Sequence, residues 1–165
     1  MKSTGTTTDR AEIARLVHAY AVAMDEADPG AFLHLFIPAG SLVVLAPGRE
    51  RPLAVFDRPG PEGIGMIATL MGEIYESTQH HVTSHVATIE GDRAGGTTYC
   101  VATHVLVEDG LRNLETLCVR YAEEFVRTPD GWRFGERRVT QMWALSTPAP
   151  RRPLAIDRAA ARRRR

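Results

Sequence analysis

The second half of the chain alternates apolar and polar residues over four long segments, and this pattern constrains the fold more than any other feature. The segments lie at about residues 79–90, 96–108, 114–127 and 132–145. Alternation with a period of two is typical of β-strands that bury one face. The linkers EGDRA and TPDG are short and contain turn-forming residues. The sequence therefore predicts an antiparallel meander of four strands.

The preceding residues show helical periodicity instead. Residues 9–26 repeat apolar side chains at steps of three and four, as in an amphipathic helix: Ile13, Leu16, Val17, Tyr20 and Met24. Asp9 followed by Glu12 fits a capping box. Asp28 and Pro29 fit the start of a short second helix. A third helix, weakened by glycines, is expected within residues 61–77.

Two further strands are expected between the second and third helices. Residues 41–46 form an apolar run, and a shorter run at 53–56 lies inside a loop rich in proline and glycine at 47–61. Helices that precede a long meander indicate an α+β fold, with the helices packed on one face of a mixed or antiparallel sheet.

The formal net charge of zero conceals an uneven distribution. Residues 148–165 hold seven arginines and one aspartate, so residues 1–147 carry a net charge of −6. Such a tail can touch an acidic surface, but like charges repel and chain ends fray. We expect residues 1–8 and 148–165 to be disordered and 9–147 to form one domain. An acidic domain without interleaved basic and aromatic residues is a poor nucleic-acid binder.

No apolar run reaches the roughly 20 residues that span a bilayer, and the N-terminus lacks a hydrophobic signal core. These features predict a cytoplasmic protein that does not bind membranes.

Four of the six histidines crowd into the first two predicted strands of the meander: His80, His81, His85 and His104. Alternation puts His80 on one face of its strand and His81 and His85 on the other. The pattern alone favours a hydrogen-bonded core role for His80 and a solvent-exposed helix end for Asp25.

The turn between these two strands decides whether His80 meets His104. A two-residue loop, Gly91-Asp92, would put the two imidazoles on opposite faces, whereas a three-residue loop that includes Arg93 would place them opposite one another with Cβ atoms about 5 Å apart. Asp-Arg lacks the glycine that a two-residue turn favours at its second position. We therefore expect the longer loop, and a β-bulge at Gly95-Gly96 is an alternative way to shift the register.

Four segments, in this order and spacing, carry a resemblance to a known family: EIARLVHAYAVAMDEADPGAFLHLF, TQHHVTSH, YCVATHV and DGWRFGERRVTQMW. They look like SnoaL-like proteins of the nuclear-transport-factor-two-like superfamily, over about residues 9–146. The resemblance implies a cone-shaped, strongly curved sheet closed by about three N-terminal helices around an apolar pocket. Superfamily members include dehydratases, a dehydrochlorinase, isomerases, cyclases and dioxygenase small subunits, so the fold alone does not decide the chemistry.

The resemblance also implies a set of catalytic residues. Scytalone dehydratase has a catalytic histidine in a Thr-Gln-His segment, which matches His80, and a second about one hairpin later, which matches His104. Its catalytic aspartate ends the first helix, where Asp25 stands. Met24 replaces the tyrosine that precedes that aspartate, which argues against scytalone itself as the substrate. Imidazole suits such chemistry because its ordinary pKa of about 6.5 makes both protonation states available.

An arginine completes the expected catalytic set. A related dehydrochlorinase has an arginine five residues after a strand tryptophan, which maps to Arg137 after Trp132. Arg137 and Arg138 point to opposite faces of a strand, and Arg137 is the expected pocket residue. No carboxylate or cysteine cluster completes a metal-binding set with the histidines, and the sequence has no nucleotide-binding glycine motif. We therefore expect neither a metal nor a cofactor.

The expected substrate is a small hydrophobic cyclic molecule, because the residues predicted to contact it are mostly apolar: Tyr20, Met24, Phe36, Met66, Leu70, Met71 and Trp143. His85 is an alternative contact, although alternation assigns it to the outer face of the sheet. Three functions compete. The first is a cofactor-independent lyase of the dehydratase type that uses Asp–His general acid–base catalysis. The second is an isomerase or polyketide-type cyclase with the same base. The third is a non-catalytic ligand-binding protein or assembly subunit, like a dioxygenase small subunit.

The outer face of the sheet predicts a homodimer or higher homo-oligomer. Ala87, Tyr99 and Val101 are expected there beside His81 and His85, which would leave an apolar patch in water.

Overall fold

The first helix, α1 (Thr7–Asp25), begins with a capping box formed by Thr6 and Asp9. The Thr6 hydroxyl accepts a hydrogen bond from the Asp9 backbone N–H at 3.1 Å, and the Asp9 carboxylate accepts one from the Thr6 backbone N–H at 2.8 Å. The predicted box on Asp9 and Glu12 was therefore wrong. The helix begins within the predicted N-terminal tail because Thr6 supplies the capping hydroxyl, and Asp9 is its partner.

The computed structural model describes residues 5–149, and the predicted arginine-rich tail from residue 150 onward lies outside this range. After α1 come the remaining elements: α2 (Pro29–Leu33), β1 (Phe36–Leu45), β2 (Ala54–Phe56), α3 (Met66–Ile74), β3 (Tyr75–Glu90), β4 (Arg93–Glu108), β5 (Leu111–Thr128) and β6 (Gly131–Pro148). No helix within the described residues is both long enough and apolar enough to cross a membrane.

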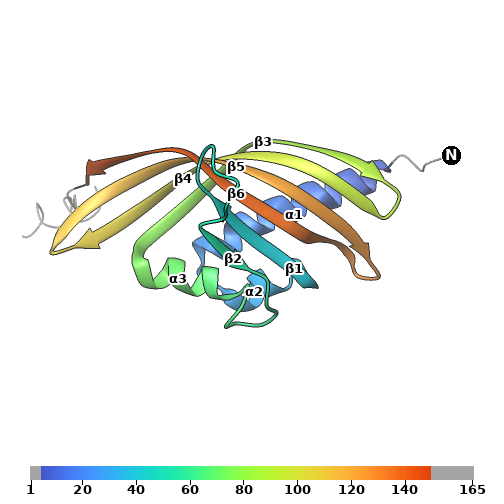
Figure 1. The fold of residues 1–165 in the computed structure, drawn as a ribbon, viewed down its shortest axis with the longest axis horizontal. Helices are drawn as coiled ribbons and strands as arrows, with labels where there is room; N and C mark the ends of the chain where they lie inside the picture. The colour runs from blue at the N-terminus through green and yellow to red at the C-terminus, as the bar shows by residue number, and fades with distance from the viewer. Residues whose placement is uncertain (1–4, 150–165) are drawn as a thin grey trace, which may run out of the picture.

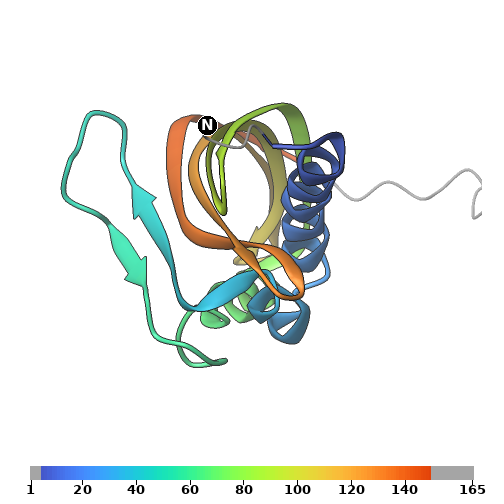
Figure 2. The same cartoon turned by 90° about the vertical axis from the view of Figure 1, so that its right-hand side faces the viewer.

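The strands form one mixed sheet in the order β2-β1-β6-β5-β4-β3. The predicted antiparallel meander corresponds to β3–β6, and β1 joins it by pairing parallel to β6. The helices lie on one side of the long strands in Figure 1, and the turned view in Figure 2 shows α1 running alongside the sheet. The prediction of an α+β fold with helices packed on one face is confirmed.

The hairpin between β3 and β4 differs from the prediction. Glu90 pairs with Arg93, so the loop has two residues, and Gly91 adopts the positive φ of +63° that such a turn requires. A β-bulge at Thr83 then shifts the register between Val82 and Ser84. The extra residue reverses the alternation of the bulged strand relative to its partner.

This bulge determines which histidines share a face. His80 pairs with Ala102, two residues from His104, so His80 and His104 lie on the same inward face. His85 lies beyond the bulge and also faces inward, so its predicted position on the outer face was wrong. Ala87 was also predicted on the outer face, but it lies beyond the bulge and packs against the core.

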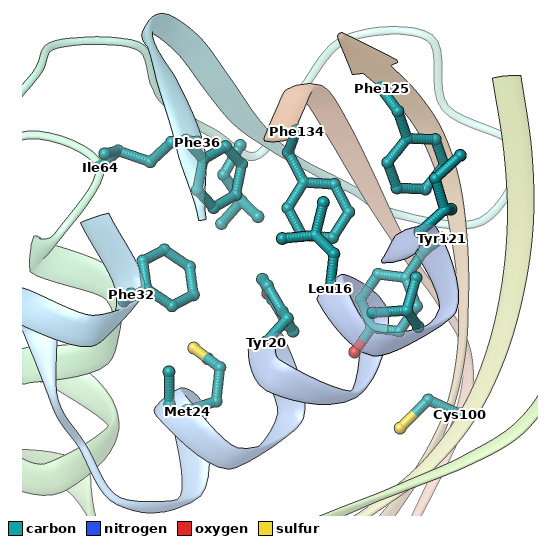
Figure 3. Close-up of a cluster of buried hydrophobic side chains, with 14 of the residues drawn as sticks. Leu16, Tyr20, Met24, Phe32, Phe36, Ile64, Cys100, Tyr121, Phe125 and Phe134 are labelled. Carbon is teal, nitrogen blue, oxygen red and sulfur yellow. The ribbon is translucent and has the colours of Figure 1, made fainter. Parts of the chain in front are cut away.

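An aromatic cluster fills the space between the helices and the sheet. Figure 3 shows Tyr20 of α1 and Phe32 of α2 packed toward Phe36 and Phe134 of the sheet. The ring centroids are 5.1 Å apart for both Tyr20–Phe32 and Phe36–Phe134, which is typical of favourable aromatic pairs. This packing fixes the orientation of α1 and therefore the position of Asp25 at its end.

Candidate active site

The Asp25 carboxylate at the end of α1 binds His80 on β3 through two separate groups. Its Oδ1 atom is 2.6 Å from the His80 Nδ1 atom, and its Oδ2 atom accepts the His80 backbone N–H at 2.9 Å. The Thr78 hydroxyl donates to Oδ1 at 3.0 Å. The backbone bond fixes the carboxylate relative to β3, and the side-chain bond then orients the imidazole.

These contacts define the proton arrangement of the pair. Burial raises the pKa of Asp25, but hydrogen bonds from the His80 side chain and backbone and from Thr78 outweigh it, so the pKa is lowered. An ionised Asp25 can only accept, so Nδ1 of His80 carries a proton, and a neutral His80 leaves Nε2 free to act as a base. The His80 side chain is only 6% exposed.

His104 on β4 lies next to this pair but has a different environment. Its ring centroid is 5.4 Å from that of His80 and 4.5 Å from that of Tyr75. Neither ring nitrogen has a hydrogen-bond partner among the described residues. Burial and the neighbouring His80 lower the pKa of His104 to about 4, so at neutral pH its imidazole is uncharged.

A hollow of about 150 Å³ approaches Asp25 from the junction of α1, α3 and β3. Met24, Met71, Tyr75 and Thr78 are among the residues that line it. Two of the predicted substrate-contacting residues, Met24 and Met71, therefore lie beside the carboxylate.

Other predicted lining residues lie elsewhere. Tyr20 and Phe36 belong to the aromatic core, and Leu70 is half-buried on α3. Met66 faces a separate hollow beside β2. Trp143 is 53% exposed and pairs with Cys118 on the outer face, so its prediction as a pocket wall was wrong. A register shift between Cys118 and Val119 changes the face to which this end of β6 presents its side chains.

Arg137 on β6 is the largest fully buried side chain of the domain. Its guanidinium carbon lies 3.8 Å from the ring centroid of Tyr20 and 3.9 Å from that of Tyr121. The Nη2 atom of Arg137 is 3.1 Å from the Oε1 atom of Glu123, which makes an ion pair. The angle between the N–H bond and that oxygen does not allow a hydrogen bond. The prediction that Arg137 and Arg138 lie on opposite faces of the strand is confirmed, because Arg137 is fully buried whereas Arg138 is 48% exposed and forms an ion pair with Glu136.

Glu123 connects Arg137 to His85. The Thr98 hydroxyl donates to Glu123 Oε2 at 2.7 Å, and Thr98 Oγ1 is 2.8 Å from His85 Nδ1. Burial raises the pKa of Glu123, while Arg137 and Thr98 oppose that change. Burial, followed by the charge of Arg137, lowers the pKa of His85.

The sequence reasoning missed Thr78, Thr98 and Glu123. A usable signal existed for Glu123, which stands between Tyr121 and Phe125 on the face of β5 that alternation assigns to the core. A carboxylate at an inward position needs a partner, and Arg137 opposite it on β6 is that partner. Across residues 5–149, no three His, Cys, Asp or Glu side chains are grouped as metal ligands.

The arrangement of the helices and the sheet agrees with a family assignment from the sequence. The chain belongs to the SnoaL-like domain family, which matches residues 5–138. None of the curated proteins matches the sequence.

Solved structures have the same fold. One is a proposed aromatic ring hydroxylase from Novosphingobium aromaticivorans, which is 27% identical over 87% of this chain and 96% of that chain, with a TM-score of 0.73. A proposed scytalone dehydratase from the same organism is 18% identical over 88% and 90% of the two chains, with a TM-score of 0.69. A hexachlorocyclohexane dehydrochlorinase from Novosphingobium barchaimii is 16% identical over 89% and 95%, with a TM-score of 0.71.

Proposed function

We propose that this protein is a cofactor-independent lyase of the dehydratase type, with Asp25 and His80 as its base. The observation that carries the proposal is the 2.6 Å contact between Asp25 Oδ1 and His80 Nδ1 on a nearly enclosed imidazole. A carboxylate in this position fixes the tautomer and stabilises the imidazolium that forms when Nε2 takes a proton. General acid–base assistance of this kind is worth roughly 10²–10⁴-fold in rate.

The proposed reaction removes water from a carbon skeleton in two proton transfers. Nε2 of His80 takes a proton from a carbon next to a carbonyl group or on an activated ring. The electron pair of that C–H bond forms the new double bond, and the neighbouring C–O bond breaks. The departing oxygen then takes the proton back from His80 and leaves as water, which regenerates the neutral imidazole.

His104 acts in this proposal as a neutral hydrogen-bond donor to the departing oxygen. The resemblance assigned His104 a catalytic role, but an imidazole with a pKa of about 4 holds too little of the charged form near neutral pH to serve as a cationic proton donor. Its 5.4 Å ring separation from His80 would allow both residues to contact neighbouring atoms of one substrate.

The proposed substrate is a small hydrophobic cyclic molecule that sits between the helices and the inward face of the sheet. The apolar neighbours of the pair, Met24 and Met71, support this class. The arch of β3–β6 over α1 in Figure 1 and the bulge at Thr83 support a cone-shaped sheet around that substrate.

An isomerase or cyclase is the second candidate. The favouring observation is that only His80, of the two neighbouring imidazoles, has a carboxylate partner. A single base can return its proton to a different carbon with no leaving group, and the product then keeps the mass of the substrate.

The test is a mass-spectrometric screen of hydroxylated ring compounds with the wild-type protein and with Asp25→Asn. Loss of one water molecule, abolished by the substitution, is the expected result. A product of unchanged mass that also depends on Asp25 would indicate isomerisation or cyclisation. Turnover that Asp25→Asn leaves intact, or no turnover by the wild-type protein of any compound that it binds, contradicts the proposal and favours a ligand-binding or assembly subunit.

A further inference from the structure

A second polar group of side chains lies inside the domain and has no part in the proton transfers. It consists of Arg137, Glu123, Thr98 and His85, which come from four adjacent strands of the sheet. Arg137 and Glu123 have side chains that are 0% exposed. We refer to these four residues as the Arg137 network.

The hydrogen bonds of Thr98 define the protonation of this network. The hydroxyl has one proton, which it donates to Glu123 Oε2 at 2.7 Å. It must therefore accept the 2.8 Å bond from His85, so Nδ1 of His85 carries a proton and Nε2 of the neutral ring does not. His85 thus has an unprotonated nitrogen that is able to accept a hydrogen bond.

Arg137 is the unsatisfied member of the network. Its Nε, Nη1 and Nη2 atoms are buried, and none makes a hydrogen bond within the described part of the chain. Its guanidinium carbon lies 3.8 Å and 3.9 Å from the ring centroids of Tyr20 and Tyr121, which are themselves 5.8 Å apart, so the two rings contact it from directions roughly at right angles and offer no hydrogen-bond acceptor to its N–H groups. Buried donors without partners are rare in native proteins because each carries a desolvation cost. A ligand oxygen would satisfy them.

The charge of the network limits what that ligand is. The Arg137 guanidinium stays protonated in proteins, and Glu123 lies 3.1 Å away with Thr98 donating to its other oxygen, which favours the carboxylate form. The pair is then neutral overall. A second carboxylate would meet the negative charge of Glu123 at close range and lose its own hydration. An uncharged oxygen would accept from Arg137 without that penalty.

We infer that the Arg137 network recognises an uncharged carbonyl or hydroxyl oxygen on the substrate, at a point remote from the reacting carbon. This inference rests on the proposed function for the position of the reacting carbon. Arg137, which the resemblance assigned to catalysis, is therefore a specificity-determining residue.

The sheet register sets the size of the molecule that would reach both sites. Thr98 pairs with His85, and Ala102 pairs with His80. Thr98 and Ala102 both face inward on β4. They are four positions apart, which corresponds to about 13 Å along the strand. Long side chains at both ends shorten that span, so a fused two-ring skeleton with an oxygen substituent matches it. Binding must open the packed interior, because Arg137 is fully enclosed in the structure.

The experiment measures binding of three unreactive probes by isothermal titration calorimetry at pH about 8, where the carboxylate form of Glu123 is favoured. The probes share one skeleton: 2-naphthol carries an uncharged hydroxyl, 2-naphthoate a carboxylate and naphthalene no oxygen. A phenol remains largely protonated at that pH. The wild-type protein should bind 2-naphthol roughly tenfold or more tightly than naphthalene, as a hydrogen bond from a charged donor implies. It should bind 2-naphthoate more weakly than 2-naphthol.

Charge substitutions then locate the effect. Glu123→Gln leaves Arg137 uncompensated, so the affinity for 2-naphthoate should rise roughly tenfold and exceed that for 2-naphthol. Glu124→Gln is the matched control, because it removes the same charge from the next residue on the exposed face. Arg137→Met should abolish the preference for 2-naphthol over naphthalene, whereas Arg138→Met should keep it.

Several outcomes would overturn the inference. For the wild-type protein, these outcomes are equal affinity for 2-naphthol and naphthalene, tighter binding of 2-naphthoate than of 2-naphthol, or no binding of any probe. For the variants, the contradicting outcome is a Glu124→Gln effect as large as that of Glu123→Gln. The wild-type series decides the matter even if Glu123→Gln does not fold. The probes do not react, and Asp25→Asn should leave their order unchanged, so a failure of the proposed catalysis is distinguishable from a failure of this inference.

Discussion

The Nδ1 atom of His80 lies 2.6 Å from the Oδ1 atom of Asp25, although 55 positions separate the two residues in the sequence. A second contact, from the His80 backbone N–H to the other carboxylate oxygen, ties the end of α1 to β3. The same aspartate therefore positions the strand and selects the tautomer of the imidazole.

Removal of the Asp25 acceptor should change the tautomer of His80. In the wild-type protein at neutral pH, uncharged His80 should carry its proton on Nδ1. Asp25→Ala should shift the neutral form toward Nε2–H, which is the tautomer favoured in free histidine. Nitrogen-15 spectra of histidine-labelled protein measure this directly. Glu26→Ala, at the neighbouring exposed position, is the control, and identical spectra for Asp25→Ala and the wild-type protein would refute the assignment.

The buried, neutral His104 should make stability depend on pH. Its folded pKa of about 4 lies below the ordinary value of 6.5, so the unfolded state binds more protons between these values. The contribution of neutral His104 to the free energy of unfolding is fully present above pH 6.5 and is lost as the pH falls toward 4. Between pH 7 and 5 the loss should be about 2 kcal/mol.

Urea unfolding of the wild-type protein and His104→Gln at these two pH values checks the effect. Other groups titrate in both proteins, so the readout is the difference between the two pH dependences. His104→Gln should lose about 2 kcal/mol less than the wild-type protein. Equal losses would show that His104 is readily protonated in the folded state.

Arg137 and Arg138 should contribute very differently to stability. Arg137→Met leaves Glu123 as a buried charge without its cationic partner, which costs about 3–5 kcal/mol. Arg138→Met removes an exposed ion pair with Glu136 and should change the free energy of unfolding by about 0–1 kcal/mol. Denaturant titrations of both variants test the comparison, and similar small changes would contradict the ion-pair assignment.

The outer face of the sheet should mediate a homodimer. Tyr99, Trp143 and Leu145 are 42%, 53% and 56% exposed there, which is a large apolar content for a face in contact with water. Trp143→Arg should therefore give a monomer, whereas Val55→Arg on β2 should leave the assembly intact. Light scattering at micromolar concentration measures the mass, and a monomeric wild-type protein would count against this prediction.

Much of the fold follows from periodicity. The amphipathic pattern of α1 and the alternation of β3–β6 identify these elements, since each reflects burial of one face. The pairing of Asp25 with His80 was anticipated only through the family resemblance, because no local pattern links a helix end to a distant strand. Neither the parallel pairing of β1 with β6 nor the extension of β3 to Tyr75 was predicted.

The register of the first hairpin shows why the rest of the site was harder to predict. A three-residue loop was expected to bring His80 and His104 to one face, but a two-residue loop and a bulge at Thr83 do so instead. The bulge has no distinctive residue type, and it also turned His85 inward. The register shift between Cys118 and Val119 is a second example, because it turns Trp143 to the outer face of the sheet. A single inserted residue reverses every later side chain, and alternation alone does not locate it.

The most direct test of the central claim is a double-mutant cycle on turnover once a substrate is found. Asp25→Asn and His80→Ala should each lower kcat on the order of 10²-fold or more, because an amide cannot stabilise the imidazolium that forms in the transition state. Glu26→Gln should leave kcat unchanged. The double variant should lose little more than either single variant, since the two residues act as one unit. Losses that multiply in the double variant would show that Asp25 and His80 work independently and would contradict the account.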